Sequence, residues 1–126
     1  MAKGVLTNIG KEKICRALSG DGTLPIITYM VFGDGGVDGD GNVIEITGRE
    51  TELKSELARM PIDKHTYLSN TTCRFTKAIQ KMELAGKSIS EIGLYDSEND
   101  LVAYKTFPTK SKGEDEIFVF DMDVIL

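Results

Sequence analysis

The 126-residue chain has no tryptophan, and only 7% of its residues are aromatic. Its core must therefore be built from isoleucine, leucine, valine and methionine, with a few phenylalanine and tyrosine side chains. It has one histidine, His65, and two cysteines, Cys15 and Cys73, that lie far apart in the sequence. This excludes the cysteine pairs and histidine clusters that form zinc sites. We expect both thiols to be reduced and to lie in or near the core, and His65 to lie on the surface.

Long apolar runs are also missing, and so is an excess of positive charge. No segment approaches the roughly 20 apolar residues that span a membrane, and the N-terminus lacks the apolar stretch of a signal peptide. Acidic residues outnumber basic ones by 20 to 15, for a formal charge of -5, and no basic stripe with interleaved aromatic residues is present. We expect a chain that is made in the cytoplasm and binds neither membranes nor nucleic acid.

The motifs of common enzyme classes are absent. The sequence has no Gly-x-Ser-x-Gly, no phosphate-binding Gly-x-x-x-x-Gly-Lys-Ser/Thr and no nucleotide-binding Gly-x-Gly-x-x-Gly after a strand. A single histidine leaves little from which to build a nucleophile with an oriented base. Asp121 and Asp123 share one face of a strand, where contact with water explains them without chemistry. We expect no enzymatic activity, no cofactor and no bound metal.

The clearest local structure is a β-hairpin in the last third of the chain. Ile89 to Tyr95 is rich in β-branched, aliphatic and aromatic residues, Asp96 to Asp100 is polar, and Leu101 to Phe107 is a second apolar segment. This pattern predicts two strands joined by a loose turn. Gly93 lies inside the first strand, which indicates a bulge or the close approach of another side chain or backbone.

The remaining segments predict two helices and several further strands. The first helix is capped by Thr7 or Asn8 and stopped by Gly20, and we expect its apolar side to cover a sheet. A second, short helix is predicted over residues 51–57. Further strands are predicted over residues 26–32, 58–68, 71–79 and 117–126. The predicted fold class is α+β, a single domain over residues 1–126 with the N-terminal helix packed on a mostly antiparallel β-sheet or sandwich.

The last predicted strand, residues 117–126, is the most regular in the chain. Its apolar residues alternate with polar ones, so that one face carries Phe118, Phe120, Met122 and Val124. A buried internal strand explains this pattern best. The alternative is an edge or exchangeable strand that adds to the sheet of a partner protein.

The glycine-rich loop Gly33–Glu45 gives a different functional hypothesis. Asp34, Asp38, Gly39 and Glu45 fall at positions 1, 5, 6 and 12 of a calcium-binding loop. Position 3, however, is a glycine where a ligand belongs, and the loop follows a strand where a helix is required. A solvated turn is the more typical explanation, and a calcium-dependent binding or adhesion module is the alternative function.

Three motifs occur in the order found in one protein family. They are Leu6-Thr7-Asn8-Ile9-Gly10, the strand from Ile26 that ends in Gly33-Asp34-Gly35, and Glu91-Ile92-Gly93-Leu94-Tyr95-Asp96 followed by Leu101-Val102-Ala103 and Phe107-Pro108. Together they resemble phage tail-collar fibre proteins, whose N-terminal domain attaches a fibre to the tail. Members of that family usually continue into a long fibre, whereas this sequence stops at Leu126. We therefore expect a stand-alone version that is not itself the fibre.

The resemblance implies a structural protein of a phage tail or of a related contractile, bacteriocin-like particle (a tailocin), at its baseplate or collar. The implied partners are tail baseplate proteins and a tail fibre, and because such fibres are usually trimeric we expect a homotrimer in the assembly. The chain would be made in the bacterial cytoplasm and then carried on the tail of the particle. The predicted interface residues are Gly33, Asp34, Gly35, Gly93, Phe118, Phe120, Met122 and Val124.

Overall fold

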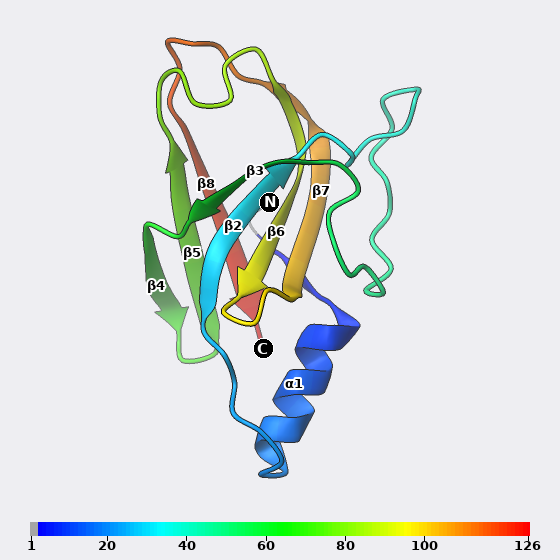
Figure 1. Cartoon of the computed structure of the whole chain (residues 1–126), viewed down its shortest axis with the longest axis vertical. Helices are drawn as coiled ribbons and strands as arrows, with labels where there is room; N and C mark the ends of the chain where they lie inside the picture. Colours follow the sequence, from blue (N-terminus) through cyan, green and yellow to red (C-terminus); the bar gives the residue numbers. More distant parts are fainter. Residues whose placement is uncertain (1–2) are drawn as a thin grey trace.

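The computed structural model describes residues 3–126, which form mostly antiparallel β-structure (Figure 1). β-structure accounts for 48% of the chain and helix for 9%. A five-stranded sheet has the order β1-β7-β6-β2-β3, and a three-stranded sheet has the order β4-β5-β8. The elements are β1 (Val5–Leu6), α1 (Asn8–Leu18), β2 (Ile27–Gly33), β3 (Glu56–Pro61), β4 (Lys64–Ser69), β5 (Thr72–Ile79), β6 (Ser88–Asp96), β7 (Leu101–Ser111) and β8 (Phe118–Ile125).

The β6–β7 hairpin confirms the predicted pair of strands. The two strands pair in antiparallel register, with Gly93 opposite Tyr104. Asp96 closes the turn, since its Oδ1 accepts hydrogen bonds from the amides of Glu98 and Asp100 at 2.9 and 3.1 Å. A short polar side chain that satisfies two turn amides explains why this connection needs no Asn-Gly pair.

The predicted α+β class is wrong, because the fold is β-rich and its helix does not cover a sheet. Helix α1 begins after Thr7, whose Oγ1 accepts a hydrogen bond from the Gly10 amide at 3.1 Å, and it stops before Gly20, which has a φ of +83°. Both ends agree with the prediction. Gly10 is its one buried residue, whereas Leu18 is 83% exposed. The apolar positions are too few to form a covering face, and the helix extends beyond the sheet (Figure 1).

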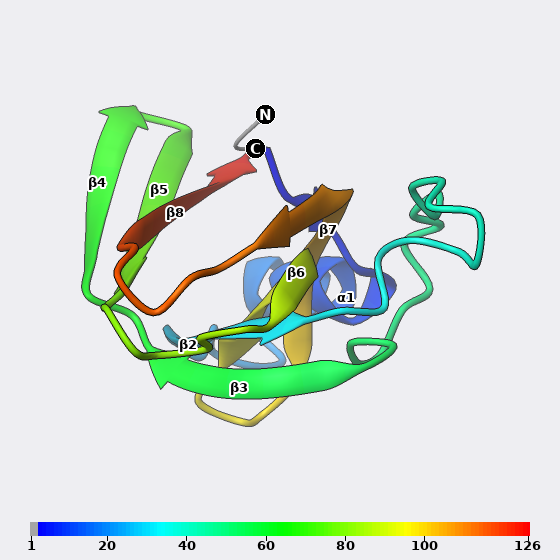
Figure 2. The same ribbon diagram turned by 90° about the horizontal axis from the view of Figure 1, so that it is seen from above.

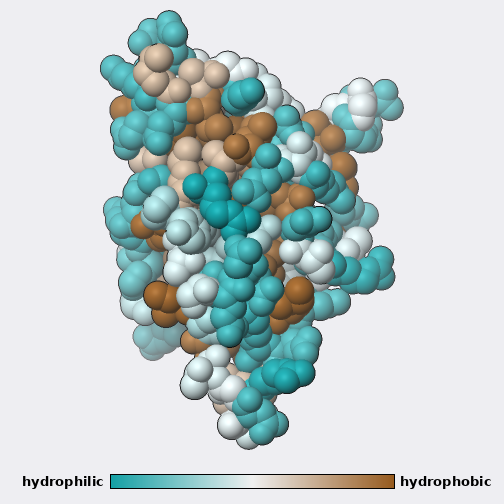
Figure 3. Space-filling view, in the orientation of Figure 1, coloured by the Kyte–Doolittle hydropathy of each residue, from teal (hydrophilic) through white to brown (hydrophobic). Residues whose placement is uncertain are grey.

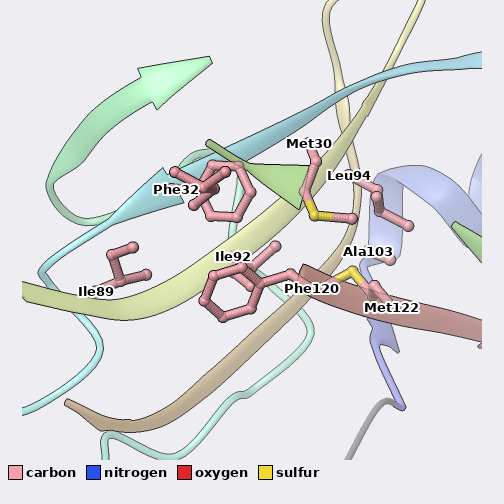
Figure 4. Packing of buried hydrophobic residues seen from close by; sticks show 9 residues of the cluster. Met30, Phe32, Ile89, Ile92, Leu94, Ala103, Phe120 and Met122 are labelled. Atoms are coloured by element: carbon pink, nitrogen blue, oxygen red, sulfur yellow. The ribbon is translucent and has the colours of Figure 1, made fainter. Parts of the chain in front are cut away.

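The main core lies between the two sheets. Its buried members are Met30, Phe32, Ile79, Ile89, Ile92, Leu94, Ala103, Phe120 and Met122. Figure 4 shows Phe120 and Met122 on β8 among side chains of the five-stranded sheet, and the ring centroids of Phe32 and Phe120 are 5.3 Å apart. The apolar face of β8 therefore belongs to the core, although β8 is an edge strand of its own sheet.

A second apolar cluster lies on the other face of the five-stranded sheet. Its buried members are Val31, Leu53, Tyr95, Leu101 and Tyr104. The long connection from β2 to β3, residues 34–55, supplies Leu53 to this cluster and lies on the opposite side of the five-stranded sheet from β4 and β5 (Figure 2). The middle of the five-stranded sheet is thus buried on both faces, which explains the nearly continuous apolar runs in β2 and β6.

Residues 51–57 do not form a helix, so that prediction is wrong. Leu53 is only 5% exposed and packs into the second cluster. The amides of Lys54 and Ser55 donate to a buried side chain of β6 instead of to helical carbonyls, and β3 begins at Glu56. Tertiary contacts therefore override a weak local preference for helix.

The predicted strand over residues 58–68 is divided into β3 and β4, which belong to different sheets. The division falls at Asp63, whose carboxylate accepts hydrogen bonds from the amide of Ala78 at 2.8 Å and from Lys77 Nζ at 3.0 Å. These bonds hold the connection against β5. The ion pair with Asp63 also explains why Lys77 interrupts the apolar alternation of its strand.

The two cysteines differ in burial. Cys15 is exposed, so its predicted position in or near the core is wrong, whereas Cys73 is half-buried, and both are free thiols. Burial raises the pKa of Cys73, with a smaller contribution from the nearby Asp123 carboxylate, so this thiol is less acidic than usual. His65 is exposed on β4, as predicted. Within residues 3–126, no helix is long and apolar enough to cross a membrane.

Candidate functional site

A buried carboxylate on β6 holds the long loop, residues 34–55, against the sheet. Glu91 is completely buried. Its Oε2 accepts hydrogen bonds from the amides of Gly35 and Ser55, both at 2.8 Å. Its Oε1 accepts from the amide of Lys54 at 2.9 Å and from the hydroxyl of Tyr104 at 2.6 Å. We call these five residues the Glu91 clamp, in which four donors satisfy a buried carboxylate that has no partner cation among the described residues.

Tyr104 provides the side-chain donor of the clamp from β7. Burial raises the pKa of Tyr104, and its hydrogen bond to Glu91 raises the pKa further, so the hydroxyl keeps its proton and donates. Gly93 lies opposite Tyr104 in the paired strands, and its surroundings are closely packed. A Cβ at Gly93 would lie 2.5 Å from Leu101 Cδ1 and 2.6 Å from Leu53 Cδ1. The predicted close approach of another side chain at Gly93 is therefore confirmed.

Glycine is required where the long loop crosses β6. A Cβ at Gly33 or Gly35 would lie 2.5 or 2.6 Å from Glu91 Oε2. At Gly36 a Cβ would lie 1.8 Å from the carbonyl oxygen of Ser90, and the Gly36 amide donates to the Ser90 hydroxyl at 2.9 Å. The missing side chains therefore let the loop backbone lie directly on the strand.

The N-terminal motif is attached to the start of β7. The hydroxyl of Thr7 donates to the carbonyl oxygen of Leu101 at 2.6 Å, and the Thr7 amide donates to that of Val102 at 2.9 Å. Gly10 lies so close that a Cβ there would be 2.7 Å from the Val102 carbonyl oxygen. The three sequence motifs are therefore joined around one hairpin by buried contacts.

Three carboxylates near the β6–β7 turn surround a lysine from the helix. Lys13 Nζ lies 2.6 Å from Asp96 Oδ2, 2.9 Å from Glu98 Oε1 and 2.8 Å from Asp100 Oδ2. Burial lowers the pKa of Lys13, but hydrogen bonds to the three carboxylates outweigh it and raise the pKa above its usual range. Within residues 3–126 this is the one group of three acidic side chains close enough to share an ion. The ammonium group already lies among them, so the cluster fastens α1 to the turn.

The acidic side chains of the Gly33–Glu45 loop are arranged differently. Asp38 Oδ1 accepts hydrogen bonds from the amides of Asn42 and Asp40, both at 2.9 Å, and these bonds hold the pKa of Asp38 below its usual value. Among the described residues, the carboxylates of this loop form no group within reach of one ion. The loop is a closed polar turn, and its geometry gives the calcium hypothesis no support.

The predicted interface residues fall in two separate parts of the molecule. Three glycines meet at or beside the Glu91 clamp, with an exposed aspartate next to them on the loop; these are Gly33, Gly35, Gly93 and Asp34. The others lie on the core-facing side of β8; these are Phe118, Phe120, Met122 and Val124. An interface role for either group stays a prediction, since these contacts are all within the chain.

Glu91 and Tyr104 were not among the predicted site residues. The available signal was a lone acidic residue inside a strand of otherwise buried residues, because a buried carboxylate needs several hydrogen-bond donors. Its donors come from positions 13 to 56 residues away. The sequence therefore indicates that Glu91 needs partners without indicating which residues they are.

Comparison with known families agrees with the motif analysis. The family model described as phage tail-collar fibre protein, N-terminal, matches residues 1–117. The matched region includes the N-terminal motif and all five residues of the Glu91 clamp, and it ends one residue before β8. A search of curated proteins finds no match.

Proposed function

Because the chain belongs to the phage tail-collar fibre family, we propose that it attaches a tail fibre to the tail of a phage or of a phage-tail-like contractile particle. Family membership gives it a structural role in a phage tail, since this is a family of tail components and not of enzymes. The family model describes the N-terminal part of a fibre protein, which supports a position at the fibre root, on the baseplate or collar.

The observation that carries this proposal is the location of the family motifs. They supply Glu91 and Gly35 of the Glu91 clamp and the N-terminal attachment to β7, which help to fix a long loop and a helix on a two-sheet body. The edges of the two sheets at β3, β4 and β8 lie outside this buried network. A rigid body with strand edges suits a protein that joins two others through main-chain pairing.

The proposed assembly has three copies of this single-domain chain at each fibre root. The proposed partners are baseplate proteins on one side and the tail fibre on the other. The chain would be made in the bacterial cytoplasm and then carried on the assembled tail. The support for these points is family membership together with the trimeric form that is usual for such fibres.

Removal of the chain from the producing strain is expected to give tails that lack fibres. The reason is that a fibre without its attachment protein has no site on the tail. Electron microscopy of purified particles measures the fraction of tails with fibres, and expression of the parent chain from a plasmid is the control that restores them. Tails that keep a full set of fibres without the chain contradict the proposal.

A further inference from the structure

β7 of the five-stranded sheet and β8 of the three-stranded sheet lie along one side of the molecule, which we call the seam. The described N-terminal residues bridge the two strands along only part of this seam. The amide of Gly4 donates to the carbonyl oxygen of Asp123 on β8 at 2.9 Å, while β1 pairs with β7 at Ala103 and Tyr104. Beyond Tyr104, β7 continues to Ser111 with no further described strand on that side. The described residues thus leave the seam open between the second half of β7 and the first half of β8.

A groove of about 620 Å³ lies along this open part of the seam. Its lining includes three aromatic rings, and the centroids of Phe107 and Phe118 lie 6.0 and 5.9 Å from that of Phe120. Ile117 and Val119, also in the lining, are 52% and 63% exposed. The groove therefore exposes apolar surface that continues directly into the main core. Such a continuous apolar lining is typical of binding grooves.

β8 also presents main-chain hydrogen-bonding groups to this groove. The amide of Leu126 donates to Thr71 beside β5, whereas the carbonyl of Asp123 accepts from Gly4 on the opposite side. Main-chain groups of successive residues in a strand point in alternate directions. The main-chain amides and carbonyls of even-numbered β8 residues therefore point toward β5, and those of odd-numbered residues point toward the seam. Val119 directs both its amide and its carbonyl toward the groove, where an added strand could pair with them.

The charged residues of the groove favour an acidic partner. Two lysines, Lys105 and Lys110, and one aspartate, Asp121, contribute to its lining, and Lys105 Nζ already donates to the main-chain carbonyl oxygen of Asp121 at 2.9 Å. The Asp121 carboxylate already accepts a hydrogen bond from the Thr76 hydroxyl at 2.7 Å on the other face of the sheet. The groove is thus a locally positive site on a chain with a formal charge of -5. Exposed Lys110 is placed to attract a carboxylate that lies in the groove.

We propose that this groove binds one extended strand of a different tail protein, in which large apolar side chains alternate with acidic ones. The strand would pair with Val119, pack its apolar side chains on Phe107 and Phe118, and place its acidic side chains near Lys110. The chain's own N-terminal segment is a precedent for this arrangement, because it already bridges β8 and β7 next to the groove. The inference rests on the proposed attachment function and specifies the chemistry of the partner.

A second copy of the chain fits this edge poorly. The second half of the β8 edge is already occupied, because the Asp123 carbonyl accepts from the Gly4 amide, so pairing with β8 of another copy could use only the residues before Asp123. The face in Figure 3 is a weaker candidate for an apolar partner, because its hydrophobic patches are separated by hydrophilic residues. We therefore assign the groove to a different protein.

Proline at position 119 tests the main-chain pairing. Val119→Pro removes an amide that the sheet itself does not use, and proline is tolerated at such edge positions. Ile125→Pro is the matched control, because it makes the same change on the same edge outside the groove. We expect both variants to fold with the parent's circular dichroism spectrum, and Val119→Pro to be incorporated into tails at least tenfold less than Ile125→Pro. If Val119→Pro does not fold, the hydrogen-exchange measurement described below decides.

Charge reversal tests the acidic character of the partner. Lys110→Glu is expected to reduce incorporation into tails about tenfold, whereas Lys64→Glu, on exposed β4, should leave it at the parent level. Equal incorporation of the two variants overturns the assignment of an acidic strand. The amount of chain per tail can be measured by quantitative mass spectrometry of purified particles.

Hydrogen exchange of residues 117–121 separates failure of this inference from failure of the attachment function. In assembled tails we expect exchange at least tenfold slower than in the free chain. If the parent chain is absent from tails, the proposed function fails. If it is present and residues 117–121 exchange as fast as in the free chain, the groove inference is overturned and the attachment function stands. Protection that grows with concentration of the free chain would instead assign the groove to a second copy, which also overturns the inference.

Discussion

Replacing Glu91 with alanine is expected to lower the free energy of unfolding by about 3–5 kcal/mol, because three backbone amides and one hydroxyl lose their buried acceptor. That is a large part of the roughly 5–15 kcal/mol that stabilises a typical domain. Glu91→Gln should cost less, about 2–3 kcal/mol, since the side chain keeps its size and one acceptor oxygen. The new NH₂ group, however, faces donors that it cannot pair with. Urea unfolding followed by circular dichroism measures both variants, since the chain has no tryptophan.

The matched control for this prediction is Glu45→Gln. Glu45 is exposed on the same long loop, so the same chemical change there should alter the unfolding free energy by less than about 0.5 kcal/mol. A Glu91→Gln variant as stable as the Glu45→Gln variant would show that the loop does not depend on the carboxylate. The hydrogen bonds of the Glu91 clamp would then contribute little to the free energy of unfolding.

Replacing Gly36 with alanine is expected to destabilise the chain by about 2–4 kcal/mol. The added Cβ would lie 1.8 Å from the Ser90 carbonyl oxygen, so one backbone must move. Ser90 belongs to β6, which is paired with β7 and β2 on its two sides and cannot shift freely. The loop is therefore expected to lift from the strand, with loss of the hydrogen bond from the Gly36 amide to the Ser90 hydroxyl. The same urea titration measures the loss.

Gly39→Ala is the control for Gly36→Ala. Gly39 lies three residues further along the loop, where a Cβ meets no atom within 4 Å and φ is not in the left-handed region. This variant should be as stable as the parent or gain up to about 1 kcal/mol from a less flexible unfolded chain. If the two alanine variants have equal stability, the loop does not lie against β6 as described.

The sequence predicted the strands whose pattern is local. β2, the β6–β7 hairpin and β8 each show apolar runs or alternation within a few residues, and all are present near their predicted bounds. The cap at Thr7 and the stop at Gly20 were also predictable, because they depend on one hydroxyl and one positive φ. Patterns within a few neighbouring residues were therefore sufficient to predict these elements.

Other features depend on residues far apart in the chain. The Glu91 donors come from the long loop and from β7, and the division of the predicted 58–68 strand depends on the contact of Asp63 with β5. The helix was expected to cover a sheet because its apolar positions recur on one side. In the structure, residues 34–55 cover the outer face of the five-stranded sheet. No local pattern shows that a glycine-rich loop, and not a helix, has this role.

The groove beside β8 and the Glu91 clamp lie on different sides of the molecule. Close contacts within the chain account for the motif glycines, at the Glu91 clamp for Gly33 and Gly35 and elsewhere for Gly10 and Gly93, so those residues need no partner to explain them. β8 lies beyond the region that the family model matches, and among the described residues its groove-facing edge carries open pairing groups beside an apolar groove. Contacts that differ between particles are therefore expected near β8 and not at the clamp.

The position of the chain in the particle tests the central claim most directly. An antibody against the chain, detected with gold particles by electron microscopy of intact tails, should label the root of each fibre at the baseplate or collar. Label at that place agrees with an attachment protein of the tail-collar fibre family. Intact tails without label, in a preparation where the free chain is abundant, would contradict the proposed function.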